Sequence, residues 1–186
     1  MKYVYFKDTI IEEQQARIPL STHALQYGTG VFDSVRGYWH KEDERIYLLK
    51  PKEHFDRLLD SAKIVGWNLS FISEFLVSKL KELVEMNQPT EDIYVRPFIF
   101  QATSKLTPTI ASEYDPTFAM YMIGIGDYLS VDRGLKGIVT SWRRIEDTMI
   151  PPRAKVCGLY INSSLARAEA SRYGADEAIF LNQDGS

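Results

Sequence analysis

The chain has little of what usually marks a secreted, membrane or nucleic-acid-binding protein. Its 186 residues include one cysteine, which cannot form an intrachain disulfide, and no apolar run reaches the roughly 18 to 20 residues of a membrane span. Its longest Lys/Arg cluster is the pair Arg143-Arg144 and its formal net charge is -3, so nucleic acid phosphates attract it weakly. No signal-peptide core follows Met1. We therefore expect a cytoplasmic protein that binds neither nucleic acid nor a membrane.

Several common catalytic motifs are missing as well. The three histidines, His23, His40 and His54, lie far apart, and none has a second ligand at a metal-binding spacing, so we expect ordinary surface or core histidines and no metal site. Gly124-Ile125-Gly126 follows an expected strand but lacks the third glycine of a dinucleotide-binding fingerprint. The chain also has no phosphate-binding P-loop and no Gly-x-Ser-x-Gly nucleophile elbow. These absences argue against a dehydrogenase, a kinase and a serine hydrolase.

What the chain does have is enough apolar sequence for a core of its own, since 45% of its residues are hydrophobic. The spacing of these residues predicts an N-terminal α+β domain over residues 1–123. The two apolar runs at 93–102 and 118–125 are long enough to be central strands of its sheet. The other elements that we expect are strands at 3–6, 9–12, 31–39 and 45–49, and helices at 23–27, 51–65 and 72–87.

A second domain is expected after a change of pattern. Residues 124–136 contain three glycines and four charged residues and are interpreted as an interdomain linker. Residues 137–186 then begin a barrel-like domain, for which we expect a strand at 137–142, a helix at 159–173 and a strand at 178–181. Asp184-Gly185 is a strong hairpin-turn signal, yet the chain ends one residue later, so we expect a truncated second domain. The predicted class is thus two-domain α/β (α+β).

One lysine in this second part lies in an unusual context. The run Pro151-Pro152-Arg153-Ala154-Lys155-Val156-Cys157-Gly158 is stiffened by prolines and rich in small residues. Most lysines are solvated surface charges. A lysine that forms a Schiff base must instead be partly desolvated, so that its amine is uncharged and nucleophilic. The residues alone leave both interpretations of Lys155 open.

A resemblance favours the second interpretation. The run Ala154-Lys155-(x4)-Tyr160-(x)-Asn162-Ser163-Ser164-Leu165-Ala166, followed by Gly174-(x)-Asp176-Glu177-Ala178, resembles the cofactor-lysine segment of branched-chain aminotransferases, which are fold type IV pyridoxal-phosphate enzymes. Three further segments resemble the same family in the same order, so the likeness covers nearly the whole chain. They are residues 23–36, 52–62 and 94–97.

The resemblance implies that pyridoxal 5'-phosphate is the cofactor. Lys155 would hold it as a Schiff base and later move a proton as general base and acid. Arg57 would contact the phosphate, and Tyr160 the phenolic oxygen of the ring. Without the resemblance, a solvated helix arginine is the favoured interpretation of Arg57. For Tyr160, a packing role and a cofactor role are then equally good interpretations. The aromatic residues implied for the substrate walls, which could also be simple core, are Tyr27, Phe32, Tyr94 and Tyr128.

The substrate carboxylate would be bound by Arg36 or Arg96, because an unpaired arginine on an apolar strand needs a partner. One departure from the family lies beside them. Where the family has Phe-Glu-Gly-Ile-Arg, this chain has Phe32-Asp33-Ser34-Val35-Arg36. Ser34 therefore stands in place of a pocket glycine, and its bulk would narrow or polarise the pocket. The acidic partner of the pyridine nitrogen lies, in the family, beyond the hairpin at Asp184-Gly185.

The implied reaction is transamination between branched-chain or similarly apolar L-amino acids and 2-oxoglutarate. The implied assembly is a homodimer, with the loop Ser104 to Ile110 reaching the neighbouring site. Three alternatives stay open. The chain could belong to a D-amino-acid aminotransferase or an aminodeoxychorismate lyase of the same fold, or it could be a catalytically silent, truncated assembly fragment.

Overall fold

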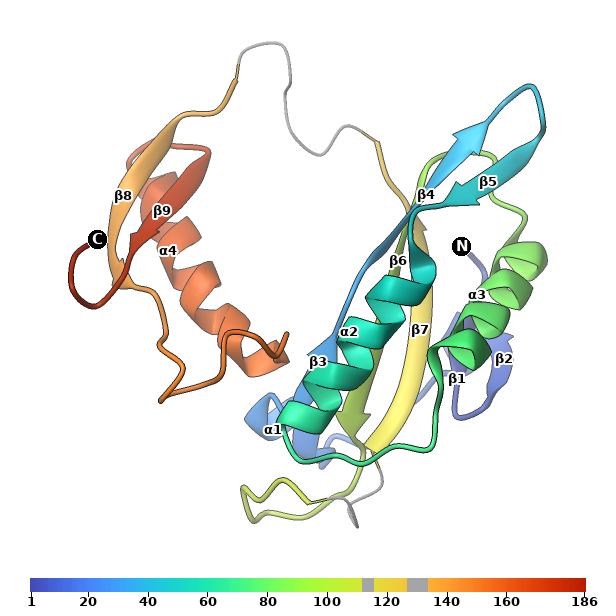
Figure 1. Cartoon of the computed structure of the whole chain (residues 1–186), viewed down its shortest axis with the longest axis horizontal. Coiled ribbons are helices and arrows are strands. Elements are labelled where there is room, and N and C mark those ends of the chain that lie inside the picture. The colour runs from blue at the N-terminus through green and yellow to red at the C-terminus, as the bar shows by residue number, and fades with distance from the viewer. Residues whose placement is uncertain (112–115, 127–133) are drawn as a thin grey trace.

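The structure is a computed structural model that describes residues 1–111, 116–126 and 134–186. In the described N-terminal part, seven strands form one antiparallel sheet with the order β2-β1-β7-β6-β4-β5, and the short β3 also pairs with β6 (Figure 1). The long strands expected in the centre of the sheet are confirmed there as β6 and β7. The strands are β1 (Tyr3–Phe6), β2 (Thr9–Glu12), β3 (Gly30–Phe32), β4 (Val35–His40), β5 (Arg45–Leu48), β6 (Ile93–Gln101) and β7 (Pro116–Gly124).

Two helices cover one face of this sheet and build the core with it. Helix α2 (Pro51–Ile64) starts with proline at its first position and ends before Gly66, whose φ is +93°. Helix α3 (Ser73–Asn87) packs beside it. The central residues of their apolar stripes, recognised from the helical spacing, are buried against the sheet, whereas Ile72 and Phe75 at the start of the second stripe are exposed. The fully buried residues of the two helices include Phe55, Leu58, Ala62, Leu76, Leu80 and Leu83.

One expected strand is interrupted, which corrects the sequence prediction of a continuous strand at 31–39. It forms β3 and β4 instead, with a gap at Asp33 and Ser34. The register on β6 is the same on both sides of the gap, because Phe32 faces Phe98 and Val35 faces Val95. The gap therefore falls opposite Pro97. The Asp33 N–H donates to the Pro97 carbonyl (2.9 Å), but proline has no N–H to return the bond.

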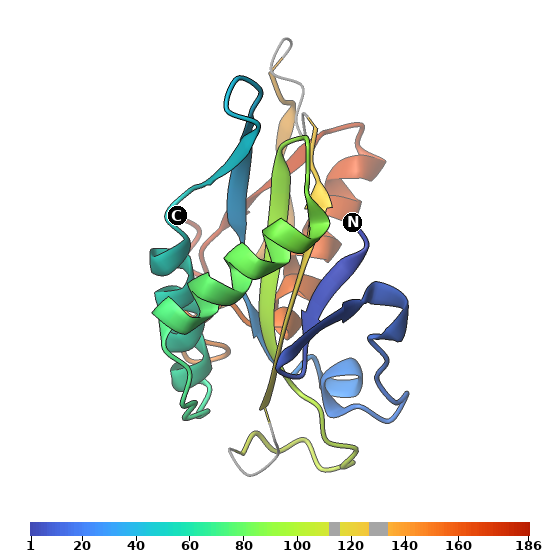
Figure 2. The ribbon, with the colours of Figure 1, turned by 90° about the vertical axis from the view of Figure 1, so that its right-hand side faces the viewer.

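The C-terminal part forms a small layer of its own. Strands β8 (Gly137–Arg143) and β9 (Glu177–Leu181) pair in parallel, and the intervening helix α4 (Tyr160–Arg172) packs on them. Glu169 of α4 fixes this packing, since its carboxylate accepts hydrogen bonds from the Thr140 hydroxyl (2.6 Å) and the Ser141 hydroxyl (2.9 Å). Figures 1 and 2 place this layer on the side of the N-terminal sheet that is away from α3.

The segment before α4 is attached to the N-terminal part. Val156 forms an isolated antiparallel bridge with Val31 of β3, and the Phe32 N–H donates to the Lys155 carbonyl (3.0 Å). After the short helix α1 (His23–Tyr27), Gly28 has a φ of +67°, and a Cβ there would lie 2.8 Å from the Gly158 Cα. The segment after α1 and the segment before α4 are therefore in van der Waals contact at these two glycines.

The elements expected from the sequence are otherwise confirmed, with their ends within two residues of the expected positions, and so is the mixed α/β class. Two short 3-10 helices, η1 (Glu13–Gln15) and η3 (Cys157–Leu159), complete the described elements. The division into domains at 1–123 and 137–186 stays a proposal, because residues 127–133 of the expected linker lie outside the described residues. No described helix combines the length and the apolar character needed to cross a membrane.

Candidate active site

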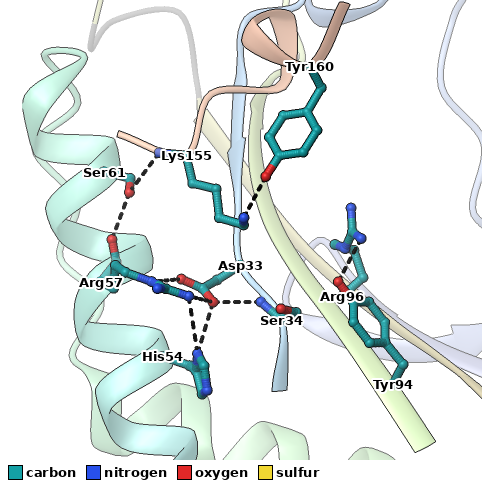
Figure 3. A network of polar contacts seen from close by, with 9 residues as sticks. All are labelled: Asp33, Ser34, His54, Arg57, Ser61, Tyr94, Arg96, Lys155 and Tyr160. Atoms are coloured by element: carbon teal, nitrogen blue, oxygen red, sulfur yellow. Dashed lines mark hydrogen bonds and ion pairs between the residues drawn. The ribbon is translucent and has the colours of Figure 1, made fainter. Parts of the chain in front are cut away.

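Lys155 is held at its backbone by two elements of the N-terminal part. Its carbonyl accepts from Phe32 of β3, and its N–H donates to the hydroxyl of Ser61 on α2 (3.2 Å). The side chain extends from there, and its Nζ donates to the Tyr160 hydroxyl at 2.6 Å (Figure 3). The Nζ also lies 4.9 Å from the centre of the Phe32 ring. The amine is therefore oriented by a phenol and an aromatic face rather than by an acid.

Arg57 is held just as firmly, on the opposite side of the lysine. Its Nε and Nη2 each donate to one carboxylate oxygen of Asp33, both at 2.7 Å. Asp33 is completely buried, whereas 54% of the Arg57 side chain is exposed. The Ser34 N–H (2.6 Å) and the His54 Nδ1 (3.0 Å) complete the surroundings of the carboxylate. In Figure 3 the Lys155 side chain lies between this ion pair and Tyr160.

The charge state of Asp33 follows from these contacts. Burial by itself raises the pKa of a carboxyl group, and here it is the largest single influence. The hydrogen bonds from Arg57, Ser34 and His54, with the positive charge of Arg57, outweigh it together and hold the pKa of Asp33 below its ordinary value. Asp33 is therefore an anion at neutral pH.

A small basic cavity lies between these groups. It has a volume of about 180 Å³, and four basic side chains line it together with the Tyr160 phenol. Arg153 also forms an exposed ion pair with Asp147 at 3.1 Å. Guanidinium groups are the preferred partners of phosphate oxygens, so this donor set fits a phosphorylated anion next to the Lys155 amine. The four basic residues are Arg57, Arg144, Arg153 and Lys155.

A second and larger cavity, of about 420 Å³, shares Tyr160 with the first. Its floor is the sheet, where the Arg96 guanidinium lies 4.3 Å from the centre of the Phe32 ring and donates to the Tyr94 hydroxyl (2.8 Å). Arg36 lies opposite Tyr94 in the register of β4 and β6. The Nε atoms of Arg36 and Arg96 are buried without a hydrogen-bond partner among the described residues. The other side chains around this cavity are Phe98, Tyr121 and Cys157.

One predicted wall residue, Tyr27, is not part of this arrangement. Tyr128 lies outside the described residues. Tyr27 is on α1, beyond the Gly28–Gly158 contact, and its hydroxyl donates to the Leu106 carbonyl. Tyr27 therefore joins the loop 104–110 rather than Lys155. The same helix holds this loop through the ring of the buried His23, whose Nε2 is 2.9 Å from the Thr107 carbonyl oxygen.

The structure thus brings together six of the predicted site residues, with Arg36 and Ser34 beside them. The six are Lys155, Tyr160, Arg57, Phe32, Arg96 and Tyr94. Sequence reasoning did not single out Asp33, His54, Ser61, Arg144 or Arg153. One available signal was the spacing of His54, Arg57 and Ser61, because steps of three and four residues place side chains on one face of a helix. No local pattern marks Asp33, because its two side-chain partners, His54 and Arg57, are 21 and 24 residues away in the sequence.

Comparisons with known proteins agree with this geometry. The family model of class IV amino-transferases matches residues 30–186. A probable branched-chain-amino-acid aminotransferase of Aquifex aeolicus is 40% identical over 185 residues, which is 100% of this chain and 59% of the relative. The Escherichia coli K12 branched-chain-amino-acid aminotransferase is 30% identical, with 98% of this chain and 59% of the relative covered.

Solved structures agree as well. A branched-chain aminotransferase from Thermoproteus uzoniensis with norvaline superposes with a TM-score of 0.91 at 34% identity, covering 98% of this chain and 60% of that one. The PLP form of a Thermobaculum terrenum enzyme superposes with a TM-score of 0.90 at 28% identity, covering 99% and 60%. The fold expected from the resemblance is confirmed, and the chain spans about three fifths of the length of these relatives. The chain belongs to the class IV aminotransferase family.

Proposed function

We propose that this chain carries the lysine half of a pyridoxal-phosphate-dependent aminotransferase for branched-chain or similarly apolar L-amino acids, with 2-oxoglutarate as the amino acceptor. The observation that supports this most is the 2.6 Å contact between Lys155 Nζ and the Tyr160 hydroxyl at the edge of a cavity lined by Arg57. Solved relatives are described with the pyridoxal form of the cofactor and with a norvaline ligand.

In this proposal the chain's own residues bind the cofactor and move the proton. Pyridoxal phosphate, when bound, supplies an electron sink for the substrate's α-carbon. Arg57 would bind the phosphate group, Tyr160 would donate to or accept from the ring oxygen, and Lys155 would be the covalent anchor. Once released, the Lys155 amine would take the proton from the α-carbon as general base and deliver it to the C4′ carbon of the cofactor as general acid, because Tyr160 holds Nζ at a defined position.

The larger cavity would accept the amino acid. Phe32 and Tyr94 provide apolar ring faces for a branched side chain, and Arg96 and Arg36 provide positive charge for a carboxylate. The orphaned Nε atoms of both arginines support a carboxylate ligand, since a buried donor without an acceptor is costly. Ser34 would narrow this pocket. Tyr27, with the loop 104–110, would reach the pocket of a second subunit in a homodimer, and Tyr128 would close the wall. We keep the cytoplasm as the proposed location.

Borohydride trapping tests the proposal directly. We expect reduction in the presence of pyridoxal phosphate to label the peptide that contains Lys155, and Lys155→Ala to remove this label. Lys136→Ala is the matched control, because Lys136 lies at the distant start of β8 and should leave the label unchanged. Label on a different lysine would disprove the assignment. Assays with L- and D-amino donors then separate the proposed reaction from that of a D-amino-acid aminotransferase.

A further inference from the structure

The carboxylate of Asp33 is satisfied to an unusual degree. It accepts two hydrogen bonds from Arg57 and one from the Ser34 N–H, and it faces the Nδ1 of His54. It has no solvent exposure at all. It occupies the gap between β3 and β4, where the missing N–H of Pro97 interrupts the strand ladder. Its position is therefore fixed by the sheet.

This carboxylate determines the orientation of the Arg57 guanidinium. The group is planar, and its Nε and Nη2 edge faces the two oxygens of Asp33, with Nη2 also 3.4 Å from His54 Nδ1. The Nη1 amino group is left, opposite the edge that Asp33 occupies, and Arg57 lines the basic cavity. Because the side chain is 54% exposed, an arginine without this partner would sample several rotamers. With the partner, a single orientation is prepared before any ligand arrives.

Stability alone does not account for this arrangement. A buried ion pair is usually no more stabilising than an apolar pair of similar volume, because both charges lose their hydration. Here one of the two charges remains half exposed at the cavity beside Lys155. A surface ion pair on the same helix, Lys52 with Asp56, offers a comparison. Both of its side chains are about half exposed, and neither lines the cavity that contains Lys155.

We propose that Asp33 is the positioning residue for the phosphate arginine: it turns the Nη1 group of Arg57 into the cavity and thereby creates the preference for a phosphorylated ligand. This inference rests on the phosphate role of Arg57 proposed above. It assigns to Asp33 an effect on phosphate recognition, which acts through Arg57 and involves no contact between Asp33 and the ligand.

The test compares pyridoxal phosphate with pyridoxal, which lacks the phosphate. Both are titrated into the 186-residue chain. The Kd of pyridoxal divided by the Kd of pyridoxal phosphate gives the phosphate preference. We expect Asp33→Asn to reduce this ratio by about tenfold or more and to change the Kd of pyridoxal by less than about threefold. Asp33→Glu should restore most of the preference, because it returns the charge. Asp56→Asn, the matched control, should leave the ratio unchanged.

The outcomes distinguish the inference from the proposal beneath it. If Arg57→Gln leaves the ratio unchanged, or if the unaltered chain shows no preference, the phosphate role of Arg57 is wrong and the inference falls with it. If Arg57→Gln abolishes the preference but Asp33→Asn does not, only the inference is wrong. An equal loss of affinity for both ligands in Asp33→Asn would indicate a purely structural role and would also overturn it.

A measurement on the unaltered chain keeps the inference testable if Asp33→Asn does not fold. Nitrogen NMR of arginine side chains can follow Arg57 while inorganic phosphate is added. We expect the Nε–H signal, which is tied to Asp33, to stay slow in solvent exchange and the Nη1 signal to move. Movement of the Nε–H signal with no response at Nη1 would contradict the proposed orientation.

Discussion

The hydroxyl of Ser61 connects the two residues on which the candidate site depends. It accepts the backbone N–H of Lys155 at 3.2 Å and donates to the carbonyl of Arg57 at 2.8 Å. Ser61 is completely buried on α2. The backbone of the lysine is thus held by the same helix that carries the arginine, although the two residues are 98 positions apart in the sequence.

Replacing Ser61 tests this connection. Ser61→Ala leaves the Lys155 N–H without its acceptor, and we expect a loss of about 1 to 3 kcal/mol in the free energy of unfolding, measured by urea denaturation. The rate of borohydride-trapped labelling at Lys155 should fall as well. Ser78→Ala is the control, because its hydroxyl also bonds a carbonyl of its own helix but is exposed. Equal effects of the two changes would show that Ser61 does not position Lys155.

Removal of the Tyr160 hydroxyl should affect reactivity rather than stability. Tyr160→Phe deletes the group that orients Nζ, and the ring, which is 38% exposed, can keep its contact with Phe32. We expect trapping of pyridoxal phosphate at Lys155 to slow by about tenfold, with a change in unfolding free energy below about 1 kcal/mol. Tyr173→Phe, at the exposed end of α4, should change neither quantity. An unchanged trapping rate in Tyr160→Phe would refute the orienting role.

The contact between Gly28 and Gly158 predicts a specific sensitivity to a single methyl group. Gly28→Ala combines a left-handed backbone with a Cβ placed 2.8 Å from the Gly158 Cα. Gly174 has a similar φ of +64° but open space around it. We expect Gly174→Ala to cost about 1 kcal/mol from backbone strain alone, and Gly28→Ala to cost about 1 to 3 kcal/mol more. Thermal unfolding of both variants measures the difference, and equal costs would mean that the two segments are not in contact.

The buried carboxylate predicts the behaviour of the chain in acid. The pKa of Asp33 is below its ordinary value of 3.8, so the folded state releases this proton more readily than the unfolded state. Its contribution to stability is complete above that ordinary value, and it is lost as the pH falls through the lower pKa of the folded state. Asp33→Asn should therefore remove part of the acid-induced loss of stability.

Urea denaturation of the unaltered chain and of Asp33→Asn between about pH 2 and pH 7 measures how the free energy of unfolding depends on pH. Asp60→Asn serves as the control, because Asp60 is an exposed carboxylate on α2, the helix that carries Arg57. If the free energy of unfolding falls as steeply toward low pH in Asp33→Asn as in the unaltered chain, the Asp33 carboxylate does not cause the acid-induced loss of stability.

The amino-acid sequence by itself determined most of the local elements and marked the lysine segment as unusual. The apolar spacing of α2 and α3 is periodic over four turns, and Pro51 and Gly66 mark the ends of the first of these helices. The unusual run around Lys155 and its spacing to Tyr160 are visible without any structure. These features are local, because a helix period or a motif is complete within a few consecutive residues.

Only the tertiary structure decided which distant residues meet. It split the strand at 31–39 because Pro97, on another strand, lacks an N–H at that register position. In the folded chain, Asp33 is buried against Arg57, and Ser61 accepts a hydrogen bond from the Lys155 N–H. Tyr27 contacts the loop 104–110 instead of the lysine. Each of these contacts depends on strand register and helix packing, which arise from the whole core. No short window of sequence contains both partners, and for that reason local patterns could not predict them.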